Sequence, residues 1–256
     1  MWTTFVVQPM INLLLWIYSL VGNFGLAIII FTVLIRLILY PLMRQQTKSA
    51  EAMQKLQQDP RWKEIQRKYK NDRERLAQEQ MKLYQELGVN PFASCLPMLI
   101  QIPVIFGLYQ AIILALGNTP AQLLELTALI YPGWDAAKLL PIDSHFLWMD
   151  LSRPERLTIP GLNFGIPVMA LLVAYTGYIQ AKVASSVSPT SGSDQAQSMN
   201  TMMSYYMPLM LGYFAMTFAS GLALYFLTSN LVSIAQYALM GKLSWRDLIP
   251  FGGGKK

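Results

Sequence analysis

The sequence predicts an all-α polytopic membrane protein, and three observations carry this prediction. Hydrophobic residues make up 54% of the chain and charged residues only 13%, too few charges for a surface that faces water. Several stretches with almost no charge reach the roughly 20 residues that a helix needs to cross a bilayer. The 20 lysines and arginines are concentrated in a few of the segments between these stretches, as is typical of cytoplasmic loops.

The N-terminal segment, residues 1–21, is apolar but is interrupted by Gln8, Pro9 and Asn12. It holds no basic residue, which argues against a signal peptide. Only about a dozen apolar residues are left in one run, which suits an extracytoplasmic helix that lies in the membrane interface. A sixth transmembrane helix is the alternative.

Five transmembrane helices are predicted after this segment. The first holds a single charge, Arg36, and the second and third hold none. Residues 199–241 are also uncharged and are long enough for two helices, with a break at Ser220 and Gly221. The predicted spans are residues 24–43, 92–117, 162–181, 199–219 and 222–241.

The positive residues orient the chain in the membrane. Eleven lie in residues 44–91, three in residues 118–161 and four in residues 242–256. Because lysine and arginine are retained on the cytoplasmic side, the N-terminus is predicted outside and the C-terminus in the cytoplasm. Residues 118–161 then form an extracytoplasmic loop, residues 182–198 a cytoplasmic loop and residues 242–256 a short cytoplasmic tail.

The segment of residues 44–87 is the only strongly charged one, with eleven basic and seven acidic residues and a net charge of +4. The Asp59-Pro60 pair breaks it, so the segment is predicted to form a cytoplasmic hairpin of two helices. One interpretation is a solvated linker between two spans. The other is a docking arm that attracts anionic headgroups, ribosomal RNA or an acidic partner.

Arg36 is the candidate functional residue that chemistry singles out. A guanidinium stays charged, and a charge in hydrocarbon costs about 3 kcal/mol on insertion scales. The predicted spans contain no Asp or Glu that could neutralise it, so water is the remaining candidate. Thr32 and Tyr40 lie one turn away on either side, and this polar stripe predicts a hydrated groove. The alternative is an anchor whose side chain extends to the inner interface.

Uncharged polar residues in the other spans fit the same groove. Each of them alone is typical of a hydrogen bond between helices, but together with Arg36 they predict a polar cavity within the bundle. They are Gln101, Gln110, Tyr175, Thr176, Tyr178, Gln180, Thr228, Ser229, Asn230 and Gln236.

Several other function classes are disfavoured. A single cysteine, Cys95, and a single histidine, His145, leave too few groups for most metal sites and histidine-based catalysis, so neither a cofactor nor an enzyme is expected. A small solute transporter or channel, with Arg36 as an anion site, is the main alternative, but it predicts two repeated halves that the sequence lacks. An intramembrane protease would need a serine with a base, or an aspartate pair, within the spans, and neither is visible in the sequence.

Five segments in a fixed order carry a resemblance to a known family. They are TVLIRLILYPLMRQQ (32–46), the charged hairpin, GVNPFASCLPMLIQIPVIFGLYQAI (88–112), FLWMDLS (146–152), and IQAKV followed by PLMLGYFAMTFASGLALYFLTSNLVSIAQ (208–236). In this order they resemble the YidC family of insertases, which is related to the mitochondrial Oxa and chloroplast Albino proteins. The resemblance covers nearly the whole chain.

The resemblance implies an insertase and chaperone in the plasma membrane of a prokaryote, with five helices around a hydrophilic groove. The groove would be open to the cytoplasm and to lipid but closed outside. The implied groove residues are Arg36, Thr32, Gln180 and the aromatic pair Tyr225 and Phe226. The implied partners are nascent membrane proteins and lipids, with the Sec translocon and the ribosome contacting residues 44–87. No other nucleic acid is expected.

Two features depart from the pattern of some relatives. The sequence resembles the short form of the family, in which no large extracytoplasmic domain is expected before the first span. The tail after Lys242 lacks a long basic extension, which argues against stable tethering of ribosomes.

Overall fold

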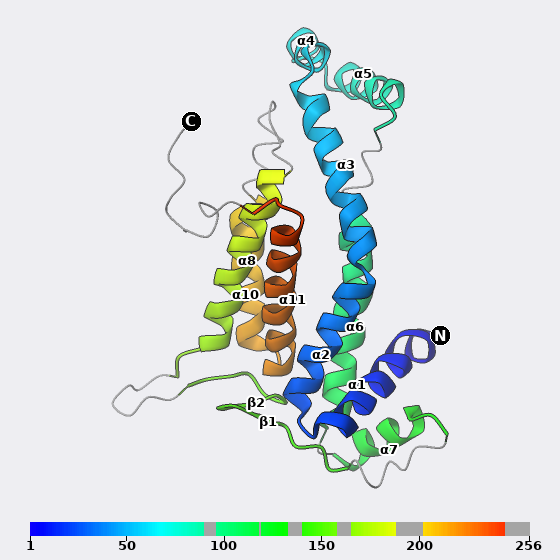
Figure 1. The fold of residues 1–256 in the computed structure, drawn as a ribbon, viewed down its shortest axis with the longest axis vertical. Helices are drawn as coiled ribbons and strands as arrows, with labels where there is room; N and C mark the ends of the chain where they lie inside the picture. Colours follow the sequence, from blue (N-terminus) through cyan, green and yellow to red (C-terminus); the bar gives the residue numbers. More distant parts are fainter. Residues whose placement is uncertain (90–95, 118, 133–139, 158–164, 188–201, 244–256) are drawn as a thin grey trace. The chain divides into compact units, whose positions relative to one another are not determined.

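The computed structural model describes residues 1–89, 96–117, 119–132, 140–157, 165–187 and 202–243, and most of these residues are helical (Figure 1). The chain divides into two compact units. The first unit comprises Met1–Ile38, Ile100–Gly177 and Leu209–Ser233, and the second comprises Leu39–Leu99, Tyr178–Pro208 and Ile234–Lys256.

Helices supply nearly all of the secondary structure, and a single small hairpin of strands accompanies them in the described residues. The first unit contains a π-helical turn Thr3–Val7, α1 Gln8–Val21, α2 Phe24–Ile38, α7 Pro120–Leu129, β1 His145–Phe146 and β2 Met149–Asp150. It also holds most of α6 Leu96–Ala115, α10 Met207–Thr217 and α11 Ser220–Leu239, and half of α8 Val168–Val187. The second unit contains α3 Tyr40–Gln58, α4 Pro60–Lys68, α5 Arg73–Glu86 and a π-helical turn Met202–Tyr206.

Several of these helices have the length and composition of membrane spans. Among the described residues, Thr3–Val21, Val168–Ser185 and Ser220–Leu239 are long and apolar enough to cross a membrane. Helices α2 and α3 qualify as a fourth if they count as one broken span, and Gln101–Ala115 and Met207–Thr217 are shorter apolar helices. The helical membrane class is therefore supported, and the count of five spans stays a prediction.

The N-terminal segment is helical from Thr3 to Val21, within the predicted residues 1–21. Pro9 lies in the first turn of α1, where the missing N–H leaves no hydrogen bond unmade. Asn12 is buried, and its side-chain amide forms two hydrogen bonds with the backbone at the end of α7. It donates to the Leu129 carbonyl over 2.9 Å and accepts from the Tyr131 N–H over 2.9 Å. Gln8, Pro9 and Asn12 therefore interrupt the apolar run but not the helix, which continues through all three. The interfacial helix and the sixth span both stay predictions.

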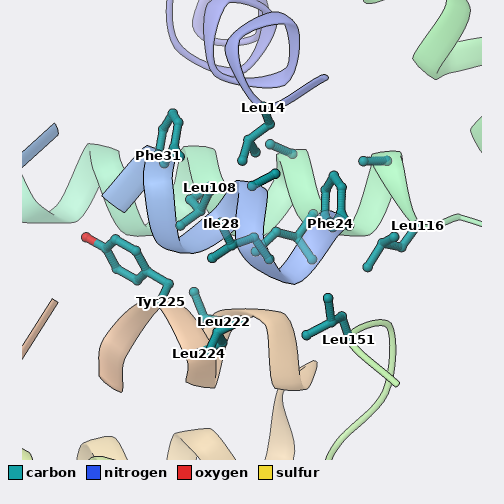
Figure 2. Packing of buried hydrophobic residues seen from close by; sticks show 14 of the residues in the cluster. Leu14, Phe24, Ile28, Phe31, Leu108, Leu116, Leu151, Leu222, Leu224 and Tyr225 are labelled. Carbon is teal, nitrogen blue, oxygen red and sulfur yellow. The ribbon is translucent and has the colours of Figure 1, made fainter. Parts of the chain in front are cut away.

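The core of the first unit forms where α2 lies between α1 and α11 (Figure 2). Leu14 from α1, Phe24 and Ile28 from α2, and Leu222 from α11 are all buried there. Two helices approach their neighbours closely. A Cβ atom on Gly25 would lie 2.2 Å from Cγ of Phe146, and one on Gly221 would lie 3.1 Å from Cγ2 of Ile112.

The junction between α10 and α11 differs slightly from the prediction. Helix α10 ends at Thr217, and Ser220 is the first residue of α11 rather than part of the break. The first two backbone N–H groups of α11 have no partner within the helix, and the loop after β2 supplies acceptors for them. Ser220 N donates to the Arg153 carbonyl over 2.8 Å and Gly221 N to the Leu151 carbonyl over 3.0 Å. These bonds hold the residues after β2 against the N-terminal end of α11.

The charged segment forms three helices rather than the expected two. Helix α3 begins at Tyr40, inside the predicted first span, because Pro41 fits the first turn of a new helix. The Asp59 side chain caps α4 by accepting from Arg61 N over 2.8 Å, and the hydrogen bonds from Arg61 lower the pKa of Asp59. The Asp72 side chain caps α5 by accepting from Arg75 N over 3.1 Å. Sequence reasoning missed this second cap.

The charged segment has a small core of its own. Leu56, Trp62 and Leu83 are buried together, and the rings of Trp62 and Tyr84 lie 5.4 Å apart. This core joins α3, α4 and α5 into one folded body rather than a set of separate solvated helices.

Candidate functional site

Arg36 lies in the last turn of α2 and is half-buried. Its Nε donates a hydrogen bond to Oγ of Ser229 over 3.0 Å, and its Nη2 contacts the same oxygen. Ser229 belongs to α11, so this contact joins two helices that are far apart in the sequence. The guanidinium is thus directed at a neighbouring helix of the first unit.

A second polar contact joins α6 to α11. Gln101 Nε2 donates to the Tyr225 hydroxyl over 2.6 Å. Tyr225 lies one helical turn before Ser229 on α11, so the two contacts are neighbours along one face. We call Arg36, Gln101, Tyr225 and Ser229 the polar cluster. Figure 2 shows Tyr225 extending from α11 with its hydroxyl oxygen at the end of the side chain.

Thr32 stands one turn before Arg36 and is fully buried. Its hydroxyl donates to the Ile28 carbonyl of its own helix over 2.6 Å. This local bond satisfies the Thr32 hydroxyl within α2.

The remaining predicted groove residues are placed differently from one another. Phe226 is buried, with its ring 5.5 Å from the ring of Tyr225, and it belongs to the hydrophobic core of the first unit. Gln180 is half-buried on α8 but belongs to the second unit, as does Tyr40. The structure therefore brings Arg36 and Tyr225 into one cluster, with Phe226 beside Tyr225.

Other polar residues of the spans bond between helices. The Asn230 Nδ2 donates to Thr176 Oγ1 over 3.2 Å and to the Val173 carbonyl over 3.4 Å, and so links α11 to α8. Sequence reasoning identified these residue types but could not find their partners. The spacing of Tyr225, Ser229 and Ser233 at intervals of four was the available signal for a polar face on α11.

The helices that carry the polar cluster hold no acidic residue, since α2, α6 and α11 contain neither Asp nor Glu. Ser229, which accepts a hydrogen bond from Arg36, carries an uncharged hydroxyl. No group of three or more His, Cys, Asp or Glu that could hold a metal ion is present in the described part of the chain.

Comparison with known proteins identifies the family. The family model described as 60Kd inner membrane protein matches residues 16–245. The chain belongs to this family, the YidC family. The resemblance inferred from the sequence is thereby confirmed.

The relatives of this YidC-family chain are named as membrane protein insertases. One from Syntrophobacter fumaroxidans is 38% identical over 240 residues, which are 92% of this chain and 37% of the relative. One from Bacillus anthracis is 35% identical over 245 residues, which are 93% of this chain and 80% of the relative. The chain thus spans less than two fifths of the first relative and most of the second.

A solved YidC structure shares the fold. It is described as an active YidC insertase with the first transmembrane domain resolved. It is similar to this chain with a TM-score of 0.56 and 28% identity, over 94% of this chain and 46% of the solved chain.

Proposed function

We propose that this chain is a membrane protein insertase that helps client proteins enter and fold in the bilayer through a hydrophilic groove bearing Arg36. The polar cluster supports the proposal most directly, since it keeps an arginine half-buried among uncharged groups. The names of the relatives point to the same activity.

In the proposed architecture, five membrane helices surround the groove. They are α2 with the start of α3, then α6, α8, α10 with its preceding turn, and α11. The groove is open to the cytoplasm and to lipid and closed outside. The N-terminal helix α1 lies in the outer interface, and residues 44–87 project into the cytoplasm.

The groove lowers the cost of moving a polar segment of the client across the membrane. Hydrocarbon about 30 Å thick separates the two sides, and each unsatisfied backbone group costs several kcal/mol within it. A hydrated groove shortens this path. The client's own apolar helix, about 20 residues long, then supplies free energy by leaving water for lipid, so no nucleotide is required.

Arg36 gives the groove its selectivity. A positive potential attracts acidic segments of a client and tolerates neutral ones. Thr32 and Gln180 are proposed as further polar groups along the client's path. A segment that enters the groove then slides outward while its apolar helix passes the lipid-facing spans.

Tyr225 and Phe226 are proposed to contact the client, and their burial has a consequence. Only 2% of Tyr225 and 7% of Phe226 is exposed, so neither ring can contact a client unless the helices that bury it move apart. For Tyr225, such a movement would break its hydrogen bond with Gln101 of α6.

The proposed partners follow from the same arrangement. Nascent membrane proteins and lipids contact the spans, and the basic residues 44–87 contact the Sec translocon and the ribosome. A small transporter with Arg36 as an anion site is the competing function.

Reconstitution tests the proposal. Purified protein in liposomes is supplied with a small single-span client, and insertion is measured by protease protection without nucleotide. Insertion above the level of empty liposomes is expected. Flux of a small anion without client insertion would favour the transporter, and cleavage of the client would favour a protease.

A further inference from the structure

A cavity of about 230 Å³ lies at the end of α6 in the first unit, away from Arg36. One wall is apolar and consists of Ile112, Ile113, Leu116 and Ala219. The polar lining residues, called the rim below, are Gln122 from the first turn of α7 and Ser152 and Arg153 from the loop after β2. No residue proposed for the groove lines this cavity.

Arg153 supplies the positive charge of the rim. Its side chain is 78% exposed, and its Nε lies 3.8 Å from Oδ2 of Asp150. The other oxygen of Asp150, Oδ1, accepts hydrogen bonds from Ser152 N over 3.0 Å and Ser152 Oγ over 2.7 Å. Asp150 therefore bonds mainly to Ser152, and its contact with Arg153 is too long for a hydrogen bond. The guanidinium of Arg153 carries five N–H donors, so several can bind a ligand.

Gln122 supplies further donors to the rim. Its Oε1 accepts from the Thr119 hydroxyl over 2.8 Å in a capping box at the start of α7. This bond assigns the oxygen and leaves the amide NH₂ of Gln122 with two donors. Gly117 makes the approach of Gln122 possible, because a Cβ atom there would lie 2.7 Å from Cβ of Gln122.

The cavity lies at the ends of two apolar helices, and the ends of such helices lie near the boundary between hydrocarbon and headgroups when they span a bilayer. It lies where the apolar helix α6 ends and where α11 begins, next to Ala219. A ligand for this cavity must cover an apolar wall with one part and accept hydrogen bonds from a cationic rim with another. A phosphate diester that carries acyl chains has both parts, and arginine is well suited to phosphate.

We propose that this cavity binds the headgroup of a glycerophospholipid. The phosphate accepts hydrogen bonds from Arg153 and Gln122, and the first carbons of an acyl chain lie against Ile112, Ile113 and Leu116. The inference does not depend on insertase activity.

Binding to purified protein in detergent tests the proposal. The protein is titrated with dioleoylphosphatidylglycerol, with dioleoylglycerol, which lacks the phosphate, and with inorganic phosphate, and bound ligand is counted by native mass spectrometry. Tightest binding of the phospholipid is expected. Arg153→Gln should weaken phospholipid affinity roughly tenfold, since a hydrogen bond to a charged group is lost.

Two further variants make the test specific. Gln122→Glu can keep the capping box but places a negative charge at the rim, so it should also weaken phospholipid binding. Arg156→Gln removes an exposed arginine that does not line the cavity and should leave the affinity unchanged.

Three results would overturn the proposal. Equal loss in Arg156→Gln and Arg153→Gln would mean non-specific attraction to charge. Dioleoylglycerol binding as tightly as the phospholipid would mean that the phosphate is not recognised. Inorganic phosphate binding as tightly as the phospholipid would mean a free anion site rather than a lipid site.

Discussion

The contact between Arg36 and Ser229 is a polar bond between two apolar helices, and it couples a charge to a small hydroxyl. A hydrogen bond to a charged group contributes about 1.5–3 kcal/mol to stability. The Ser229 hydroxyl therefore affects both the position of Arg36 and the packing of α2 against α11.

Ser229→Ala tests this contact. We expect the free energy of unfolding to fall by about 1–3 kcal/mol, because Arg36 loses an acceptor in a half-buried site. Insertion should fall less than in Arg36→Ala, since the charge is kept. Stability is measured by thermal unfolding in detergent and insertion by the liposome assay.

Ser233→Ala is the matched control. Ser233 lies one turn further along α11, and its hydroxyl donates to the Ser229 carbonyl of the same helix over 2.8 Å. Because only an uncharged hydrogen bond within one helix is lost, Ser233→Ala should lower stability by about 1 kcal/mol or less, less than Ser229→Ala. Equal destabilisation by both variants would mean that the contact with Arg36 contributes no more to stability than a hydrogen bond within one helix.

Individual polar residues could be predicted from the sequence, but their partners could not. The charge of Arg36 and the lack of acids in the spans are visible in the sequence. Ser229, however, stands 193 residues from Arg36, and no local pattern reports such a pairing. Asn12 shows the same limit, since its polar side chain is visible in the sequence but its partners, Leu129 and Tyr131, stand 117 and 119 residues away.

At the scale of whole elements, apolar runs predicted that helices exist, while capping and proline geometry decided where they end. The predicted first span crosses Leu39, where α2 ends and α3 begins. The charged segment holds one break at Pro60 that was predicted and another before Asp72 that was not. Asp72 is a favourable N-cap, but many aspartates in polar segments are not caps, so its signal is weak.

Deleting residues 50–85 tests the role of the charged segment. Because α3, α4 and α5 share a small core of their own, we expect the membrane helices to accumulate without it. Insertion should fall if residues 44–87 form the proposed docking surface, since most of that segment is lost. Membrane-bound protein is measured by immunoblot and insertion with a single-span client.

Glu51→Gln is the control for this deletion. Glu51 lies within the deleted residues and pairs with Lys242 over 2.5 Å, so the deletion also removes this ion pair. Glu51→Gln removes the pair alone and should leave insertion nearly unchanged. Full activity of the deletion variant would mean that the segment is only a linker between two spans.

At the scale of the whole molecule, composition and charge distribution predicted the helical membrane class, and the family comparison supports it. The topology rests on lysine and arginine counts, because the described helices alone do not orient a chain in a bilayer. The arrangement of the groove could not be predicted residue by residue, since it depends on contacts between distant helices.

Cysteine labelling tests the topology. In a Cys95→Ser background, single cysteines replace Gln58, at the end of α3, and His145, whose side chain is 80% exposed. An impermeant thiol reagent added to intact cells should label position 145 only. Position 58 should react after the membrane is opened, and labelling of both positions in intact cells would end the proposed orientation.

We propose that Arg36 acts as a hydrated positive charge in a groove. The most direct measurement is insertion of two clients that differ only in acidic residues of the translocated tail, by Arg36→Lys and Arg36→Ala protein at equal amounts. Arg36→Lys should keep most of the activity, and Arg36→Ala should fail with the acidic client while sparing the neutral one. Equal loss for both clients, or no loss for either, would contradict the claim.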